Sequence, residues 1–495
     1  MMSDTLEDDM QKPSNKKYKK LMANTVLFAI NALSTKLISF FLVPLYTAYM
    51  SAGEYGIVDM AQTVVSLVTP ITTLSIADAA IRFMIKDRER LDEYAAISFG
   101  ITILSIPVVC VLAPLLNFSV FGGLGHYGIW FIASYATGAL LGLMGQVARG
   151  LDEVRLIPFS AFCSSVVTLA GASLCIAWAG LGIRGYFISL CMGQIVGIVV
   201  FAIGGESGKS ILRGLKRLYH RISLYESAKP YVSQMLKYSL PLVPNSLFWW
   251  IGTSVSRLFI TGMLGIAASG LYAAASKVPN LLNTAYSIFL QAWQLSAFQE
   301  LDSDGVERFY STVFRILQAS MSILCSILSL LSPVIASLLL QGETYSSWPM
   351  IPILLLANLF SLYSSFYGTV YTSTMHTDFI MKTTVVVAVA TAFLTPLMLE
   401  LFGLSGACVA TVVSQAFVAV ARAIDSRKYI SFDPGVRTLS VTIALLVLQA
   451  VVTTTQLNCW QYISGACALT VTIVQCWKIL PLAKQYFEVR KNTSN

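Results

Sequence analysis

Long apolar runs separated by short polar segments dominate the chain from residue 21 to residue 479. A helix needs about 20 mostly apolar residues to cross a bilayer, because no water inside the membrane can satisfy its backbone groups. The pattern therefore predicts about fourteen membrane-spanning helices. Their approximate ranges are 21–48, 57–81, 95–116, 129–148, 158–180, 184–205, 239–263, 267–295, 311–335, 348–372, 382–402, 404–422, 438–455 and 461–479. The predicted fold class is an all-α polytopic membrane protein, since the strands of a membrane β-barrel would alternate in segments of about 10 residues.

Composition agrees with this pattern. Of the 495 residues 56% are hydrophobic and only 12% are charged, whereas ordinary soluble domains carry about 25% charged residues to solvate their surfaces. A soluble protein is therefore excluded. The 9 cysteines are dispersed along the chain, which also excludes a disulfide-stapled scaffold.

The distribution of basic residues predicts the orientation. An even number of spans places both termini on one side, and most of the 33 Lys and Arg residues then fall in the segments on that side. Cytoplasmic segments carry such an excess of positive charge, so we expect both termini to be cytoplasmic and the protein to be a multi-pass protein of the cell membrane. The net charge of +8 then reflects cations beside anionic headgroups of the membrane lipids, and no nucleic-acid partner is expected.

Signs of an embedded enzyme are lacking in the sequence. His126, His220 and His376 lie far apart, and no pair of cysteines has the Cys-x-x-Cys spacing, so a metal site is not expected. The predicted outer loops are short and nearly uncharged, whereas a membrane enzyme would place catalytic side chains there. The sequence therefore predicts neither an enzyme nor a cofactor.

Two predicted spans share a stripe of polar residues. A shift of 218 residues places Asp59, Gln62, Ser66, Thr69 and Thr73 on Lys277, Asn280, Thr284, Ser287 and Gln291. Both series step by three and four residues, which keeps their members on one face of a helix. Such faces line either a water-filled cavity, as expected where transporter halves are repeats, or a dry seam of hydrogen bonds between helices.

Embedded charges collect on predicted spans 1, 2, 7 and 8. They are Lys36 in the first, Asp59, Asp78 and Arg82 in the second, Arg257 in the seventh and Lys277 in the eighth. A charge facing lipid at the bilayer centre costs at least about 2.5 kcal/mol, so these side chains should face water or partners. Asp78 and Arg82 lie one turn apart, and we expect them to form a local ion pair. The excess of cations favours an anionic ligand.

Five prolines interrupt these same four spans: Pro44, Pro70, Pro241, Pro244 and Pro279. A proline inside a helix frees a backbone carbonyl and allows the helix to bend. Such bends suit helices that open alternately to the two sides of a membrane, and they also suit static kinks filled by packing.

Two segments carry a resemblance to a known family. One is 24–56, with the embedded Lys36, a Pro-Leu pair at Pro44 and a short turn at 51–56; the other is 74–82, which ends in Ala-Ala-Ile-Arg. These segments resemble bacterial polysaccharide flippases of the O-antigen and capsule repeat-unit type. The flippases form the polysaccharide transporter family of the multidrug/oligosaccharidyl-lipid/polysaccharide exporter superfamily.

This resemblance implies two pseudo-symmetric six-helix bundles plus two C-terminal helices. The implied domains are a cytoplasmic polar tail at 1–20, an N-terminal bundle at 21–205, a basic cytoplasmic linker at 206–238, a C-terminal bundle at 239–422, and the extra helices with a cytoplasmic tail at 423–495. In such a fold helices 1, 2, 7 and 8 line the cavity and the last two helices border a groove for a lipid tail.

The implied function is movement of a polyprenyl-diphosphate-linked oligosaccharide from the inner to the outer leaflet by alternating access. By position and charge, the residues for the diphosphate are Lys36, Arg257, Lys277 and Arg82, and the amides of Asn280 and Gln291 are candidates for the sugars. Asp59 and Asp78 depart from a purely cationic site and are candidates for pairing with those cations or for coupling to Na+ or H+. Glycosyltransferases and a polymerase of the same pathway are the expected protein partners.

Three other functions compete with this one. A drug/cation antiporter of the same superfamily would show twelve spans and an acidic excess in its cavity. A flippase for the peptidoglycan lipid precursor would share the whole architecture. A membrane glycosyltransferase or polymerase would need a substantial charged outer loop, whereas only Glu54, Arg184 and Glu343 lie clearly in predicted outer loops.

Overall fold

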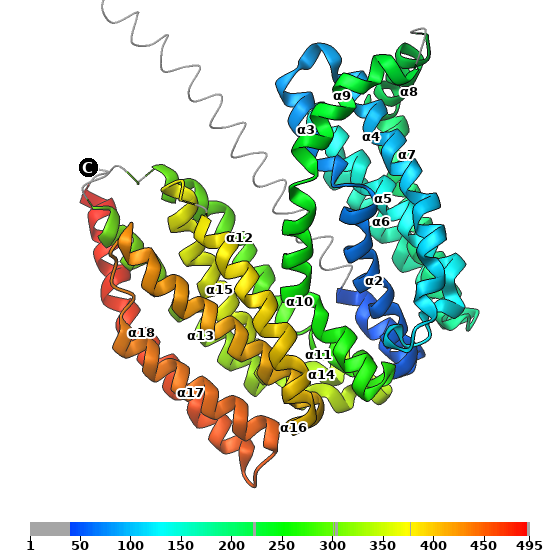
Figure 1. Ribbon diagram of the computed structural model, residues 1–495. Coiled ribbons are helices and arrows are strands. Elements are labelled where there is room, and N and C mark those ends of the chain that lie inside the picture. The colour runs from blue at the N-terminus through cyan, green and yellow to red at the C-terminus, as the bar shows by residue number, and fades with distance from the viewer. Residues whose placement is uncertain (1–39, 221–223, 300, 302–304, 377, 493–495) are drawn as a thin grey trace, which may run out of the picture. The chain divides into compact units, whose positions relative to one another are not determined.

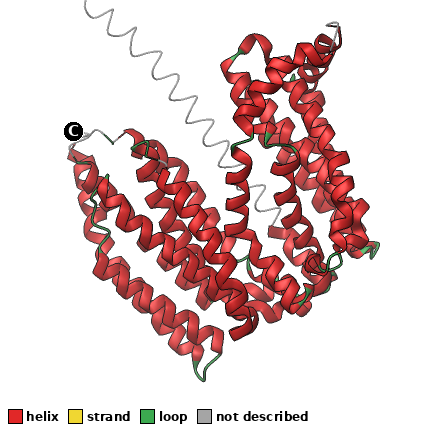
Figure 2. Ribbon diagram, viewed as in Figure 1, coloured by secondary structure: helices red, strands yellow, loops and turns green. Residues whose placement is uncertain are grey.

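The computed structural model describes residues 40–220, 224–299, 301, 305–376 and 378–492 (Figure 1). Every regular element in these residues is a helix, and none of them is a strand (Figure 2). The all-α class predicted from the apolar runs is thereby confirmed. The first predicted span lies mostly outside the described residues, which include only its end as a short apolar helix at Phe40–Tyr49.

The chain forms two compact units that are interleaved in sequence. Among the described residues, unit 1 contains 40–45, 69–113 and 129–241, and unit 2 contains 46–68, 114–128 and 242–492. The chain passes from unit 2 to unit 1 inside helix α2 (Ala52–Thr72), shortly before Pro70. Segments that are far apart in sequence therefore build each unit.

Unit 1 is a bundle around a core that includes Ile76, Met84, Tyr94, Val147 and Phe201. Its helices are α3 (Ile76–Lys86), α4 (Leu91–Leu112), α5 (Gly128–Gly150), α6 (Leu156–Ala172), α7 (Gly182–Gly204), α8 (Ser207–His220) and α9 (Leu224–Ser239). Helices α6 and α7 pack closely, and a Cβ on Gly193 would lie 2.0 Å from Oγ1 of Thr168. Small residues permit such close contact between membrane helices.

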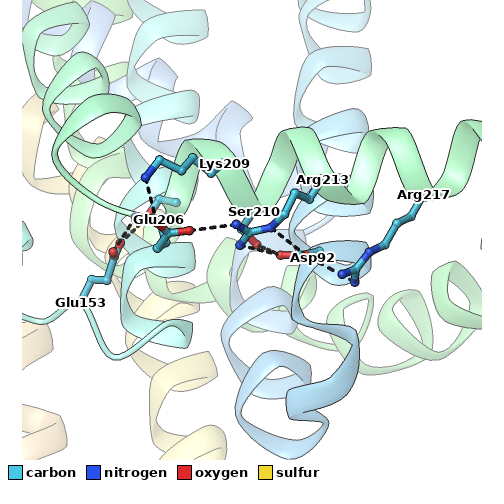
Figure 3. A network of polar contacts seen from close by, with 8 residues as sticks. Asp92, Glu153, Glu206, Lys209, Ser210, Arg213 and Arg217 are labelled. Atoms are coloured by element: carbon cyan, nitrogen blue, oxygen red, sulfur yellow. Dashed lines mark hydrogen bonds and ion pairs between the residues drawn. The ribbon is translucent and has the colours of Figure 1, made fainter.

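A network of charges fixes α8 to the start of α4 within unit 1 (Figure 3). Arg213 pairs with Asp92 at 3.1 Å and with Glu206 at 2.9 Å, and Arg217 pairs with Asp92 at 3.3 Å. The Glu153 carboxylate accepts hydrogen bonds from the backbone N–H of Glu206 and from Oγ of Ser207, where α8 begins. The basic linker predicted from the sequence thus contains an ordered helix held by acidic residues of unit 1.

Two pKa values in this network depart from their ordinary range. Hydrogen bonds from Lys209 and Arg213 stabilise the Glu206 carboxylate and lower its pKa. The hydrogen bonds to Asp92 and Glu206 raise the pKa of Arg213 in turn. Both shifts favour the charged forms that hold α8 in place.

Unit 2 contains most of α2 and all helices from residue 242 onward. They are α10 (Leu242–Leu264), α11 (Ile266–Ala275), α12 (Pro279–Gln299), α13 (Val306–Leu330), α14 (Ser332–Leu339), α15 (Ile351–Ser373), α16 (Asp378–Asp425), α17 (Val436–Thr455) and α18 (Trp460–Asn492). Aromatic rings fill the space between α12, α13 and α15, where Trp293 stacks on Phe366 with ring centroids 4.7 Å apart. Helices α13, α17 and α18 lie side by side (Figure 1).

Helix α16 contains a break at Gly403. Its 48 residues would extend about 72 Å as a straight helix, more than twice the hydrocarbon thickness of about 30 Å. Gly403 has φ +58° and ψ −143°, a combination that is essentially restricted to glycine. The break falls between the two spans predicted at 382–402 and 404–422.

The described residues contain nine helices that are long and apolar enough to cross a membrane, or ten if α2 and α3 form one bent span. The bend between α2 and α3 is 52°, and it contains Leu74 and Ser75 with positive φ. The chain is therefore a multi-pass membrane protein. The count of about fourteen spans stays a prediction, because part of the first span lies outside the described residues and α16 is a single broken helix.

Candidate functional site

Helices α2 and α11 cross in unit 2 with their backbones in contact. A Cβ on Gly56 would lie 2.2 Å from the carbonyl oxygen of Ile266, and a Cβ on Gly270 would lie 1.9 Å from the carbonyl oxygen of Ala52. Only glycine permits so close an approach. The crossing brings Asp59, one turn beyond Gly56, close to the residues that follow α11.

Asp59 forms ion pairs with two of the predicted site residues. Nε of Arg257 on α10 lies 2.6 Å from Oδ2 of Asp59, and Nζ of Lys277 lies 3.7 Å from Oδ1. Lys277 lies in the break between α11 and α12, where Pro279 begins the second helix. We call these three residues the Asp59 cluster.

Two tyrosines complete the surroundings of the Asp59 cluster. The buried Tyr55 hydroxyl interacts with the Lys277 ammonium, and the Arg257 guanidinium lies 6.0 Å from the centre of the Tyr272 ring. The side chains of Asp59 and Arg257 are 10% and 19% exposed, and that of Lys277 is 34% exposed. Two cations share one carboxylate, so the cluster has a net positive charge, and Lys277 is its most accessible member.

A polar cavity of about 440 Å³ borders this cluster inside unit 2. Arg257 and Tyr272 form one wall, and amide side chains form much of the rest: Asn280, Asn283, Asn358 and Gln415. Nδ2 of Asn283 donates to Oδ1 of Asn358 at 3.2 Å and lies 3.4 Å from Oδ1 of Asn280. The predicted residues Arg257 and Asn280 therefore line the same cavity.

A second cavity of about 400 Å³ continues from the first. The two share Trp249, Gly252, Thr253, Ser361 and Gln415 as lining residues. Arg422 of α16 lines the second cavity and donates from Nε to Oγ1 of Thr383 at 3.0 Å and from Nη1 to the carbonyl oxygen of Ser364 at 3.2 Å. Both bonds are to neutral acceptors, and no ion pair of Arg422 with an acidic side chain occurs in the described part of the chain. Together the two cavities form one polar chamber, which has Arg257 at one end and Arg422 at the other.

Other predicted site residues lie elsewhere. Lys36 lies outside the described residues, and Gln291 lies on α12 at a position whose side chain is not described. Asp78 and Arg82 lie on α3 in unit 1. The ion pair expected between these two is not formed within the described residues: Asp78 lies in the first turn of α3, where the helix dipole favours a carboxylate, and the charge that acts on it is Arg149 of α5.

The sequence analysis missed several residues of the chamber. Arg422 falls at the end of a predicted span, where positive charge is already expected from topology. Tyr55, Tyr272, Asn283 and Asn358 carry no charge, and their positions alone do not separate them from other polar residues in spans. The shift of 218 residues superimposes Asp59 on Lys277, and these two residues form an ion pair. The same shift gives no information about Arg422, the tyrosines or the other amides.

Comparison with known protein families gives one match that covers more than half of the chain. A family model described as "Polysaccharide biosynthesis protein" matches residues 21–294, which is more than half of the chain. This match confirms the resemblance drawn from the segments 24–56 and 74–82. None of the curated proteins compared matches the chain.

Several solved structures share the fold. The lipid II flippase MurJ, in an inward closed conformation, has a TM-score of 0.69 at 14% identity over 92% of this chain and 100% of its own. A multidrug resistance MATE family transporter of the MOP superfamily, in an inward-facing conformation, has a TM-score of 0.65 at 13% identity over 81% of this chain and 98% of its own. A MOP superfamily transporter from Pyrococcus furiosus, whose binding pocket is described as having reverse polarity, has a TM-score of 0.55 at 13% identity over 82% of this chain and 95% of its own.

Proposed function

Because the chain belongs to the polysaccharide biosynthesis protein family, we propose that it translocates a polyprenyl-diphosphate-linked oligosaccharide from the inner to the outer leaflet. The observation that carries this proposal is the Asp59 cluster with the chamber beside it. Arg257 and Lys277 supply two positive charges against one carboxylate, and the adjoining walls are rich in amides and hydroxyls.

The cations suit a diphosphate. A diphosphate carries at least two negative charges, and in a site of low dielectric its attraction to an ammonium and a guanidinium is strong. Arg257 would hold phosphate oxygens through its planar fork, and Lys277 would act as a point charge on a flexible stem. In this proposal the diphosphate replaces Asp59 as the partner of Lys277, which is the more exposed of the two cations.

The chamber suits a short glycan. Sugars present many hydroxyls, each of which donates and accepts hydrogen bonds, and amide side chains offer both functions in return. Asn280, Asn283, Asn358 and Gln415 provide these groups, while Trp249 provides an apolar face. The volumes of about 440 and about 400 Å³ fall in the usual range of ligand sites.

Asp59 gives the proposed cycle a way to reset. While the diphosphate is bound, the carboxylate loses a cation and would take up H+ or Na+ instead, because an unpaired buried charge is costly. After release, Asp59 recovers its pairs with Arg257 and Lys277. A drug/cation antiporter would instead need an acidic excess to attract its substrate, and the Asp59 cluster has the opposite sign.

The test is leaflet translocation in liposomes that contain the purified protein and a fluorescent polyprenyl-diphosphate oligosaccharide. We expect Lys277→Ala and Arg257→Ala to reduce the rate at least tenfold, and Lys36→Ala to do the same if that residue contributes to the site. Arg184→Ala removes an exposed cation at the start of α7 and serves as the matched control.

Three outcomes would count against this proposal or part of it. Flipping by the wild type with unaffected Arg257 and Lys277 variants would overturn the site assignment. Flipping of lipid II in preference to other lipid-linked glycans would favour the peptidoglycan-precursor alternative. Absence of flipping together with cation-driven efflux of a drug would favour the antiporter.

A further inference from the structure

A second basic pocket lies between α13, α17 and α18 in unit 2. It has a volume of about 510 Å³, and its charged lining residues are Arg315, Asp433, Arg437 and Lys478. Three cations face one carboxylate, so the pocket has a net positive charge. None of its lining residues lines the chamber beside the Asp59 cluster.

The pocket also contains hydrogen-bond donors without acceptors. Gln318 lines it and is only 2% exposed, and its Nε2 has no hydrogen-bond partner within the described part of the chain. Nε of Arg315 is likewise buried without a partner there. A buried donor that lacks an acceptor costs about 1–3 kcal/mol, so two of them in one pocket indicate that the site is built for an acceptor.

The first turn of α17 adds further donors. Gly435, Val436, Arg437 and Thr438 all line the pocket, and the backbone N–H groups at the start of a helix have no acceptor inside the helix. The helix dipole favours an anion at that position. Asp433 already uses one of these groups, because its Oδ1 accepts from the N–H of Gly435 at 2.8 Å while its other oxygen pairs with Arg315.

We propose that this pocket binds the phosphate of an anionic membrane lipid at the inner leaflet. A phosphate oxygen can accept from Gln318, from Arg315 and from the amides of α17, and Arg437 and Lys478 supply the balancing charge. This site is separate from the chamber of the proposed function and does not depend on that function.

The neighbouring surface favours a lipid over a soluble phosphate. Ile473 and Trp477 of α18 are 56% and 76% exposed beside Lys478, and Val436 at the start of α17 is 51% exposed. An exposed Trp next to a Lys is typical of the level at which a helix passes the membrane–water interface. The distribution of basic residues predicts that this end of the three helices faces the cytoplasm, where anionic lipids attract basic residues.

The test compares two phosphate probes on the purified full-length protein. Dihexanoyl phosphatidic acid and inorganic phosphate are titrated separately, with dihexanoyl phosphatidylcholine as the zwitterionic reference, and binding is measured by microscale thermophoresis. We expect the phosphatidic acid to bind at least tenfold more tightly than either comparison ligand. Equal affinity for inorganic phosphate would overturn the lipid assignment, and equal affinity for phosphatidylcholine would overturn the anion site.

Two variants localise the binding. Arg437→Ala removes an exposed cation of the pocket, and Gln318→Leu removes the unpartnered amide. Each should weaken binding of the phosphatidic acid about tenfold, since a hydrogen bond to a charged group is lost in each case. Arg308→Ala removes an exposed cation from the same helix α13 outside the pocket, and it should leave the affinity unchanged.

Gln318→Leu also distinguishes an effect on lipid binding from an effect on the stability of the fold. Replacement of an unpartnered buried amide by an apolar side chain of similar size should raise the unfolding temperature in the absence of lipid, while lipid affinity falls. Opposite signs of these two effects support the site. Unchanged affinity in a stabilised Gln318→Leu variant would overturn it.

Discussion

The guanidinium Nε of Arg257 lies 2.6 Å from the carboxylate of Asp59, and this bond joins α10 to α2. The two residues are separated by 198 positions in sequence. Lys277 approaches the other oxygen of the same carboxylate, so a single anion on α2 contacts α10 and the break between α11 and α12 in unit 2.

Asp59→Asn should destabilise the protein. The substitution preserves the shape of the side chain but leaves Arg257 and Lys277 buried or partly buried without the carboxylate they share. Removal of one partner from a buried ion pair costs roughly 3 kcal/mol. Thermal unfolding of the purified protein in detergent should show a clearly lower midpoint.

A second substitution should recover part of that loss. In Asp59→Asn combined with Arg257→Gln, the cation with the shortest contact to Asp59 is also removed, so the double variant should lose less stability than the sum of the two single variants. Additive losses would mean that the two side chains do not interact in the folded protein.

Gly270→Ala should separate α2 from α11. The added Cβ would meet the carbonyl oxygen of Ala52 at 1.9 Å, and backbone cannot yield as a flexible side chain can. We expect a loss of about 1–3 kcal/mol, as for other overpacked positions, together with loss of translocation because Asp59 moves away from Lys277.

Gly262→Ala on α10 provides the matched control for Gly270→Ala. Its added Cβ would approach only Cγ2 of Val120, at 3.7 Å. Because alanine favours a helix more than glycine does, its unfolding midpoint should stay the same or rise. A fall as large as that of Gly270→Ala would contradict the steric explanation.

Gly403→Ala should destabilise the protein although space is open around it. No atom lies within 4 Å of an added Cβ, yet the backbone φ of +58° is unfavourable for alanine, at a cost of about 1–3 kcal/mol. Gly465→Ala in α18 also meets open space and has no positive φ, so its midpoint should not fall. Urea or thermal unfolding of the two variants side by side measures the difference.

The attachment of α8 should weaken at acidic pH. The pKa of Glu206 is lowered in the folded protein by Lys209 and Arg213, so its contribution is present at neutral pH and is lost as the pH falls through this lowered value. A spin label at the exposed Leu212, in a variant whose exposed cysteines are replaced, should become more mobile as the pH falls below the ordinary pKa of glutamate, about 4.3. Glu206→Gln should show greater mobility at neutral pH and a smaller response to acid.

Arg422→Ala should impair translocation of a lipid-linked glycan without preventing folding, because the guanidinium has neutral acceptors and its removal leaves no unpaired carboxylate. We expect a reduction of about tenfold, with partial recovery in Arg422→Lys, and the liposome assay described above measures both. Arg427→Ala, an exposed cation five residues later, should flip at the wild-type rate. Equal rates for the Arg422 and Arg427 variants would remove Arg422 from the site.

Much of the fold could be predicted from the sequence, because a membrane helix requires a long, mostly apolar run of residues that is visible in the sequence. The same criterion predicted two spans, 382–402 and 404–422, on either side of the break at Gly403. The polar stripes selected Asp59, Lys277 and Asn280 as candidates, and the embedded charge of the seventh predicted span selected Arg257, since charge inside a span must face a partner or water.

Contacts that depend on packing could not be predicted in this way. The expectation that Asp78 and Arg82 form an ion pair used only their spacing, whereas the fold places Arg149 near Asp78. Arg422 lies at the end of a predicted span, where a cation is expected from topology alone, so its role in the chamber could not be predicted. The amides of the chamber come from α12, α15 and α16, and their proximity depends on how these helices pack. The close approach of Gly56 and Gly270 likewise depends on the angle at which two helices cross.

The interleaving of the two units has a consequence for biosynthesis. Unit 2 takes residues 46–68 from the early part of the chain and the rest mostly from residue 242 onward. The ribosome therefore synthesises Asp59 long before Arg257 and Lys277. When these two cations enter the membrane, the carboxylate with which they pair has already been inserted. A gene fragment that starts at residue 242 would insert the same two cations with no such partner.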